Sequence, residues 1–155
     1  MKLPLGDAEA RAKDNGDEPR TALRAEISGV PGLGDMVVYS THFQHNNGQT
    51  RLAQMKALLE AAKLDAAKAP VLLMGDFNHT PHPGEPDLLG LVKEAGFHDL
   101  AAEYSAETGK PLQATIDMGI RIDYVFSSRK LKVTDVRVLE TKVSDHYALA
   151  VTTAP

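Results

Sequence analysis

Short segments of this chain alternate between apolar and polar residues, which is the pattern of strands with one solvated face. Residues 22–27 alternate in this way, and residues 36–40 follow across a Pro-Gly turn, so the two segments predict a β-hairpin. Residues 71–74 form a wholly apolar run of the length of a buried strand. Further strands are predicted at residues 121–127, 132–139 and 147–152.

Residues 49–64 carry apolar side chains at helical spacing and predict an amphipathic helix that packs on a sheet. Asn47 is the predicted N-cap, since its side-chain oxygen can accept a hydrogen bond from a free backbone N–H. A second, short helix is predicted after Pro86, which suits a first helical turn, and Gly96 would close that helix in a left-handed conformation. Residues 101–119 show little periodicity and predict a long loop.

The strands outnumber the helices, and the helices follow strands. This order predicts an α/β fold in which one mixed, mainly antiparallel sheet is covered by helices on one face. A length of 155 residues is typical of one domain. Residues 1–18 are polar and mixed in charge and predict an N-terminal arm or loop, which leaves residues 19–155 as the single domain.

Composition narrows the function classes. The formal charge is −4, from 17 basic and 21 acidic residues, so the chain lacks the basic balance typical of proteins that bind extended nucleic acid. Cysteine is absent, which excludes disulfides and thiolate chemistry. No apolar leader follows Met1 and no run is long enough to span a membrane, so we expect a cytoplasmic protein. An exported protein that has lost its leader is the alternative.

Asp76 and Asn78 follow the apolar run of residues 71–74 directly. On an extended chain these two side chains point to the same side, so both could face one site. A carboxylate can bind a hard cation such as Mg²⁺, and an amide can hold a water or a phosphate oxygen. The alternative interpretation is a simple turn, because Asp and Asn favour turns.

Asp123 lies within an apolar strand, and a buried carboxylate is costly unless it has a partner. His146 is the candidate partner, and such a pair would raise the histidine pKa and suit proton transfer or phosphate binding. A structural Asp–His pair is the alternative. His42 ends another predicted strand, where it could equally be a capping or core histidine.

Two weaker signals remain. His42 with His45, and His79 with His82, have spacings compatible with zinc, but no cysteine or obvious helix supports such a site. Three arginines are candidate contacts for an anion, although ordinary solvated surface positions account for each of them better: Arg51, Arg121 and Arg129.

Four short motifs occur in a defined order along the chain: Thr41-His42-Phe43, Gly75-Asp76-Phe77-Asn78, Arg121-Ile122-Asp123-Tyr124 and Ser144-Asp145-His146. In this order they resemble the endonuclease/exonuclease/phosphatase superfamily over residues 19–152. The resemblance implies a DNase I-like two-sheet α/β sandwich that hydrolyses phosphate esters. It also implies roles for individual residues. His42 would stabilise the phosphate or act as an acid, Asp76 and Asn78 would orient the attacking water and the phosphate, and Asp123 would partner His146.

The resemblance further implies a Mg²⁺ or Mn²⁺ ion, with Asp145 as a ligand and Asp76 near the metal. The family's N-terminal motifs, an active-site Asn and a metal-binding Glu, have no counterpart in this sequence. The chain therefore resembles the C-terminal half of the sandwich, and its metal site is expected to be weakened.

Loss of one sheet of a sandwich would expose an apolar face larger than a monomer tolerates. We therefore expect a homodimer in which a second copy covers that face. The expected substrate is a small phosphate ester rather than extended nucleic acid, and no membrane insertion is expected. Two alternative functions are a catalytically impaired half-domain that folds by homodimerisation, and a metal-independent hydrolase of carboxylic esters.

Overall fold

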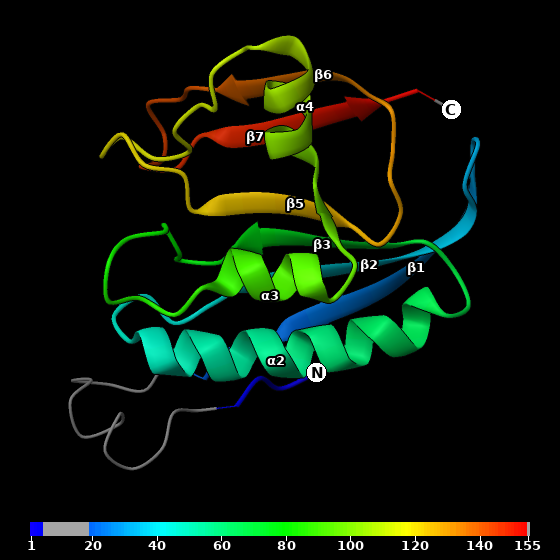
Figure 1. Cartoon of the computed structure of the whole chain (residues 1–155), viewed down its shortest axis with the longest axis horizontal. Helices are drawn as coiled ribbons and strands as arrows, with labels where there is room; N and C mark the ends of the chain where they lie inside the picture. The colour runs from blue at the N-terminus through cyan, green and yellow to red at the C-terminus, as the bar shows by residue number, and fades with distance from the viewer. Residues whose placement is uncertain (5–18, 155) are drawn as a thin grey trace.

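The computed structural model describes residues 1–4 and 19–154, which form a mixed five-stranded sheet and a separate two-stranded hairpin (Figure 1). Across the sheet the strand order is β1-β2-β3-β5-β4. Strands β2 and β3 are parallel, and all other neighbours are antiparallel. The predicted mixed sheet is therefore confirmed. Its strands are β1 (Ala22–Val30), β2 (Gly34–His42), β3 (Val71–Asp76), β4 (His98–Asp99) and β5 (Asp123–Ser127).

Helices α2 (Gly48–Ala66) and α3 (Leu88–Glu94) lie against one face of the sheet (Figure 1). The predicted cap of α2 is present, because the Asn47 side chain accepts a hydrogen bond of 2.9 Å from the Thr50 N–H. Helix α3 begins later than expected, since Asp87 rather than Pro86 marks its start and accepts a bond from the Gly90 N–H. Gly96 has the predicted left-handed conformation, with φ of 83°.

The predicted loop at residues 101–119 is wrong in its first half, where helix α4 (Leu100–Thr108) forms. The helix is defined by its ends rather than by an apolar stripe. Asp99 accepts a hydrogen bond from the Ala102 N–H at 3.1 Å, and Gly109 ends the helix with φ of 72°. Because only a few of its side chains are buried, periodicity along the sequence gives too weak a signal to predict it.

In the core between the sheet and the helices, four buried aromatic rings pack against one another. Phe77 packs edge-on against Phe43, Tyr124 and Phe126, with centroids 4.9–5.9 Å apart. Edge-to-face packing of this kind is favourable beyond the area buried. Two of these rings, Phe43 and Phe77, directly follow strands β2 and β3, so they fix the loops that leave those strands.

The opposite face of the sheet is covered only in part. The hairpin β6 (Val133–Leu139) and β7 (Ala148–Thr153) packs against that face through Leu72 of β3 and Val125 of β5. Towards β1 the same face is open, and Leu23 and Ile27 are 69% and 45% exposed. An uncovered apolar border is what half of a sandwich would leave.

Residues 1–3 pair with the chain just ahead of β1, through bonds between Leu3 N–H and the Arg20 carbonyl and between Ala22 N–H and the Met1 carbonyl. Most of the predicted N-terminal arm, residues 5–18, lies outside the described residues. None of the helices in the described ranges is long and apolar enough to cross a membrane.

Candidate active site

Three of the predicted site residues lie side by side at one end of the sheet. Strand β2 ends at His42, β3 ends at Asp76 and β5 begins at Asp123. The strand register places His42 opposite Asp76, and Asp76 opposite Asp123. Directly opposed residues point to the same side of a sheet, so these side chains form a row on the face away from α2 and α3.

His146 completes the cluster from the segment that precedes β7. Its Nδ1 lies 3.0 Å from Asp123 Oδ2, and its Nε2 lies 3.7 Å from Asp76 Oδ2. His42 approaches the same Asp76 oxygen, with Nε2 at 3.2 Å. The His42 and His146 rings therefore both approach the Asp76 carboxylate. The Asp123 carboxylate bonds to the His146 ring.

The pKa values of Asp76 and His146 are raised for different physical reasons. Burial is the main effect on Asp76 and raises the pKa of its carboxyl, although a hydrogen bond from the Asn78 N–H opposes the shift. Burial alone would lower the pKa of His146, but the hydrogen bond and charge of Asp123, together with the charge of Asp76, outweigh burial and raise it. A raised histidine pKa keeps the imidazolium present to a higher pH.

Replacement of Asp76 by asparagine is expected to stabilise the fold at neutral pH by about 1 kcal/mol, the ordinary size of one polar substitution. At pH values between the ordinary and the raised pKa, the folded protein holds a proton on Asp76 that the unfolded chain releases. The wild type therefore loses stability as the pH rises from the ordinary value of 3.8 through the raised one. Thermal unfolding of both proteins between acidic and neutral pH measures the difference. A gap that is constant across that range would contradict this account.

The end of β3 and the turn after it contain two residues with positive φ. Gly75 has φ of 133°, and a Cβ atom at this position would lie 2.0 Å from the Thr41 carbonyl oxygen. Asn78 has φ of 47°, so the extended geometry assumed for residues 76–78 is wrong. The Asn78 side-chain amide instead donates a 2.9 Å bond to the Phe43 carbonyl, which ties the end of β3 to the end of β2.

Thr115 is a positioning residue that the sequence did not reveal, because it lies within the predicted loop. It is fully buried, and its Oγ1 accepts bonds of 3.1 Å from the backbone N–H groups of Ile122 and Asp123. Its carbonyl accepts a bond from the Tyr147 N–H at 2.8 Å. The residue therefore links the segment that carries Asp123 to the segment that carries His146.

Asp145 lies on the same segment, but its side chain is exposed, and its Oδ1 is 3.4 Å from the Ser144 hydroxyl. Within residues 1–4 and 19–154, no group of three or more His, Asp or Glu side chains is arranged to hold a metal ion. The predicted ligands Asp145 and Asp76 therefore do not make a complete metal site by themselves. The same finding removes support for zinc at the His42–His45 and His79–His82 pairs.

Two of the candidate anion-binding arginines have structural partners. Arg51 is only 6% exposed, forms an ion pair with Glu85 and donates to two carbonyls near the N-terminus of α2, so a solvated surface position is wrong for it. Arg121 donates two bonds to Asp99 and lies over the Tyr124 ring at 4.3 Å. Arg129 is exposed, as expected.

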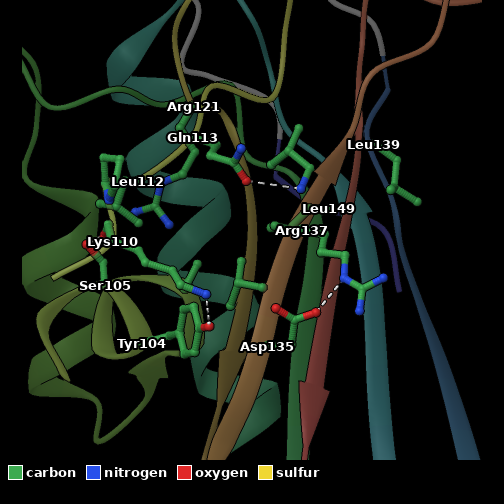
Figure 2. Close-up of a pocket in the computed structure, with 14 residues that line it drawn as sticks. Tyr104, Ser105, Lys110, Leu112, Gln113, Arg121, Asp135, Arg137, Leu139 and Leu149 are labelled. Carbon is green, nitrogen blue, oxygen red and sulfur yellow. Dashed lines mark hydrogen bonds and ion pairs between the residues drawn. The ribbon is translucent and has the colours of Figure 1, made fainter. Parts of the chain in front are cut away.

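Two cavities flank the hairpin. One, of about 490 Å³, lies beside the cluster and is lined by Asp123, His146, Ser40 and Met74 among others. The other, of about 460 Å³, lies between α4 and β6 (Figure 2). Its cations are bonded within the chain: Lys110 to the Tyr104 hydroxyl, Arg121 to Asp99 and Arg137 to Asp135. The first cavity gives access to the histidine–carboxylate cluster, because Asp123 and His146 line it and no residue of the cluster lines the second.

Solved structures share this fold. An endonuclease/exonuclease/phosphatase protein from Beutenbergia cavernae is 25% identical, with a TM-score of 0.70 over 97% of this chain and 43% of its own. A family protein from Leptotrichia buccalis is also 25% identical, with a TM-score of 0.66 over 88% of this chain and 55% of its own. The catalytic domain of human Nocturnin, with bound sulfate, shares the fold at 19% identity and a TM-score of 0.68 over 98% of this chain and 58% of its own.

The chain thus spans about half the length of the solved structures that it matches. No curated protein matches it. The model of the Endonuclease/Exonuclease/phosphatase family matches residues 2–146, nearly the whole chain. With the DNase I-like half-fold and its histidine–carboxylate cluster already described, this match shows that the protein belongs to the endonuclease/exonuclease/phosphatase family.

Proposed function

We propose that this protein hydrolyses small phosphate esters at the cluster of His42, Asp76, Asp123 and His146. Membership of the family supports a phosphoesterase-type hydrolase. The observation that carries the proposal for this chain is the meeting of two imidazoles at Asp76 Oδ2, with Asp123 behind one of them. Three contacts of 3.0 to 3.7 Å thus link four groups that can exchange protons or stabilise charge.

Hydrolysis of a phosphodiester requires two proton movements. A bond forms between a water oxygen and phosphorus while the ester P–O bond breaks, the water gives up a proton, and the departing oxygen takes one. A positioned imidazole or carboxylate can accept the first proton, and an imidazolium can donate the second. Because phosphoryl transfer depends mainly on positioning and charge stabilisation, fixed cationic rings beside the phosphate would also lower the barrier.

His146 is the group best placed to work in both protonation states. When Nδ1–H donates to Asp123, Nε2 is left facing Asp76 and the open side of the cluster. The Asp123 carboxylate fixes the ring orientation and stabilises the charged form. We assign His42 to phosphate stabilisation or proton donation, and Asp76 and Asn78 to orientation of the water and the phosphate.

Family members typically use divalent metals, and Mg²⁺ or Mn²⁺ would supply charge stabilisation when bound. The described residues do not fit such an ion as a complete set, because among them no group of three or more donor side chains is arranged to hold it. We therefore propose that the chain by itself binds Mg²⁺ or Mn²⁺ weakly, and that further donors must come from outside this cluster. The acidic net charge supports a compact substrate rather than extended nucleic acid.

Hydrolysis of bis-p-nitrophenyl phosphate, followed with added Mn²⁺ or Mg²⁺ and again with a chelator, tests the proposed function. We expect turnover above the rate in buffer, increased by the metal and decreased in the Asp145→Ala variant. Absence of turnover under every condition from a protein with a folded circular-dichroism spectrum would overturn the proposal. That result would favour the second candidate, a catalytically impaired half-domain, for which the lack of a three-donor metal set is the supporting observation.

A further inference from the structure

Strand β1 leaves part of its outer edge open. β1 is the terminal strand of the five-stranded sheet, with β2 on its inner side. Among the described residues, residues 1–3 bond to the outer side only as far as Ala22. At the other end, the register of β1 is irregular between Ile27 and Val30. The regular open edge is therefore the segment from Leu23 to Ile27.

The hydrogen-bonding direction of this edge follows from Ala22. Both its N–H and its carbonyl bond to Met1, so they point away from β2. Backbone groups alternate in direction along a strand, and those of Arg24 and Glu26 must therefore point outward as well. Such an edge, with unpaired donors and acceptors, is a template for another strand.

The side chains of the open edge are complementary to a reversed copy of themselves. In an antiparallel pair of β1 strands centred on Ala25, Arg24 of one copy opposes Glu26 of the other, and Leu23 opposes Ile27. Arg24 and Glu26 lie on the face that carries α2, where Arg24 pairs within its own chain with Glu26 at 2.8 Å and with Asp65 at 2.7 Å. Leu23 and Ile27 lie on the open face. Opposite charges and apolar pairs in directly opposed positions both stabilise antiparallel strands.

The centres next to Ala25 do not fit. A twofold axis at Arg24 would place the two copies of Arg24 opposite each other, and an axis at Glu26 would do the same for Glu26. Like charges in directly opposed positions are destabilising. If the twofold axis passed between two residues, a residue whose backbone groups point outward would face one whose backbone groups point inward. The hydrogen-bond pattern of the pair would then be broken. Ala25 is the midpoint of the open segment, and pairing about it satisfies backbone, charge and apolar contacts together.

We propose that two copies of this chain associate through antiparallel pairing of their β1 strands about a twofold axis at Ala25. The two sheets then form one continuous sheet, and the most exposed apolar residues of β1 become covered by each other. This arrangement differs from the stacked dimer expected from the sequence, because it joins edges and leaves the middle of the open face uncovered. It goes beyond the proposed catalytic function, and catalysis and association can be measured separately.

Charge reversal gives a specific test. R24E places two carboxylates opposite each other across the axis, and E26R places two guanidinium groups opposite each other. Each variant alone is expected to raise the dimer dissociation constant, measured by analytical ultracentrifugation on the full chain, by about tenfold or more. An equimolar mixture restores opposite charges at both positions, so native mass spectrometry should show the mixed dimer in preference to either homodimer.

The controls are K56E and E60R, which make the same charge changes at exposed positions of α2 away from the edge. They should leave the dissociation constant within twofold of the wild type. Circular dichroism checks that all four variants keep the fold. A wild-type chain that remains monomeric, or a dimer that neither reversal weakens, would overturn the proposal. A dimer disrupted instead by M74K, on the open face, would point to the stacked arrangement.

Discussion

Replacement of His146 by alanine is expected to lower phosphodiester hydrolysis by about 10²–10⁴-fold, the range for loss of a general acid or base. The ring is the group that connects the two carboxylates of the cluster, with contacts of 3.0 Å to Asp123 and 3.7 Å to Asp76. Because its side chain is about one-third exposed, its removal should cost little stability. Steady-state rates on bis-p-nitrophenyl phosphate, with thermal unfolding of the same preparation, separate the two effects.

Asp123→Asn supplies a pH-dependent readout for the same assignment. The hydrogen bond and charge of Asp123 raise the pKa of His146 against the opposing effect of burial, so a neutral amide should lower that pKa. If His146 works as the imidazolium, activity falls as the pH rises through its pKa. The falling limb of the pH–rate profile should then move to lower pH in the variant. An unchanged profile would contradict the role of Asp123 as the group that holds His146.

His98 provides a matched control for both variants. It also forms a histidine–carboxylate pair, with Nδ1 at 2.6 Å from Glu103 Oε1, and its side chain is about one-third exposed. His98 lies on β4, at the far edge of the sheet and outside the cluster. His98→Ala should therefore leave the rate within about twofold of the wild type. A loss comparable to that of His146→Ala would mean that the assay reports folding rather than catalysis.

Gly75→Ala is expected to lower the free energy of unfolding by about 2–6 kcal/mol, or to prevent folding. Two costs combine at this position. The backbone has φ of 133°, a strained conformation for any residue with a Cβ, which costs about 1–3 kcal/mol. The added methyl group would also lie 2.0 Å from the Thr41 carbonyl oxygen of the neighbouring strand, and such overpacking costs about 1–3 kcal/mol more. Chemical denaturation measures the sum.

Gly84→Ala separates these two costs. Gly84 also has a positive φ, of 93°, but nothing lies within 4 Å of a Cβ atom built there. Its substitution should therefore cost only the backbone strain, about 1–2 kcal/mol. Equal destabilisation by the two substitutions would show that the approach of β2 to Gly75 is not a tight one.

Much of the architecture could be predicted from the sequence because the apolar periodicity of its main elements is strong. Residues 71–74 and 49–64 carry buried side chains at strand and helix spacing, and both elements form close to the expected bounds. Helix α4 was missed because its caps and its packing on β5 and β6, rather than its own pattern, define it. Propensity is a weak signal in a helix of this length.

The residues of the candidate site could be predicted from the sequence, but their geometry could not. The contact of Asp123 with His146 could be anticipated, because a carboxylate within an apolar strand needs a partner. The left-handed Asn78 and the buried Thr115 could not be anticipated. Their conformations depend on segments far away in the chain, Phe43 for one and residues 122–147 for the other. Hydrogen bonds of this kind, which join separate segments of the chain, leave no local sequence pattern.

Thr115 also constrains the order in which the protein can become functional. Asp123 and His146 are brought together through a short antiparallel contact between residues 115–117 and 145–147, whose two sides are about thirty residues apart. The segment carrying His146 follows all five strands of the sheet along the chain, so β1, β2 and β3 can already be in place when it emerges. During synthesis, the sheet would therefore form as an inert platform. The histidine that completes the cluster would arrive among the last contacts of folding.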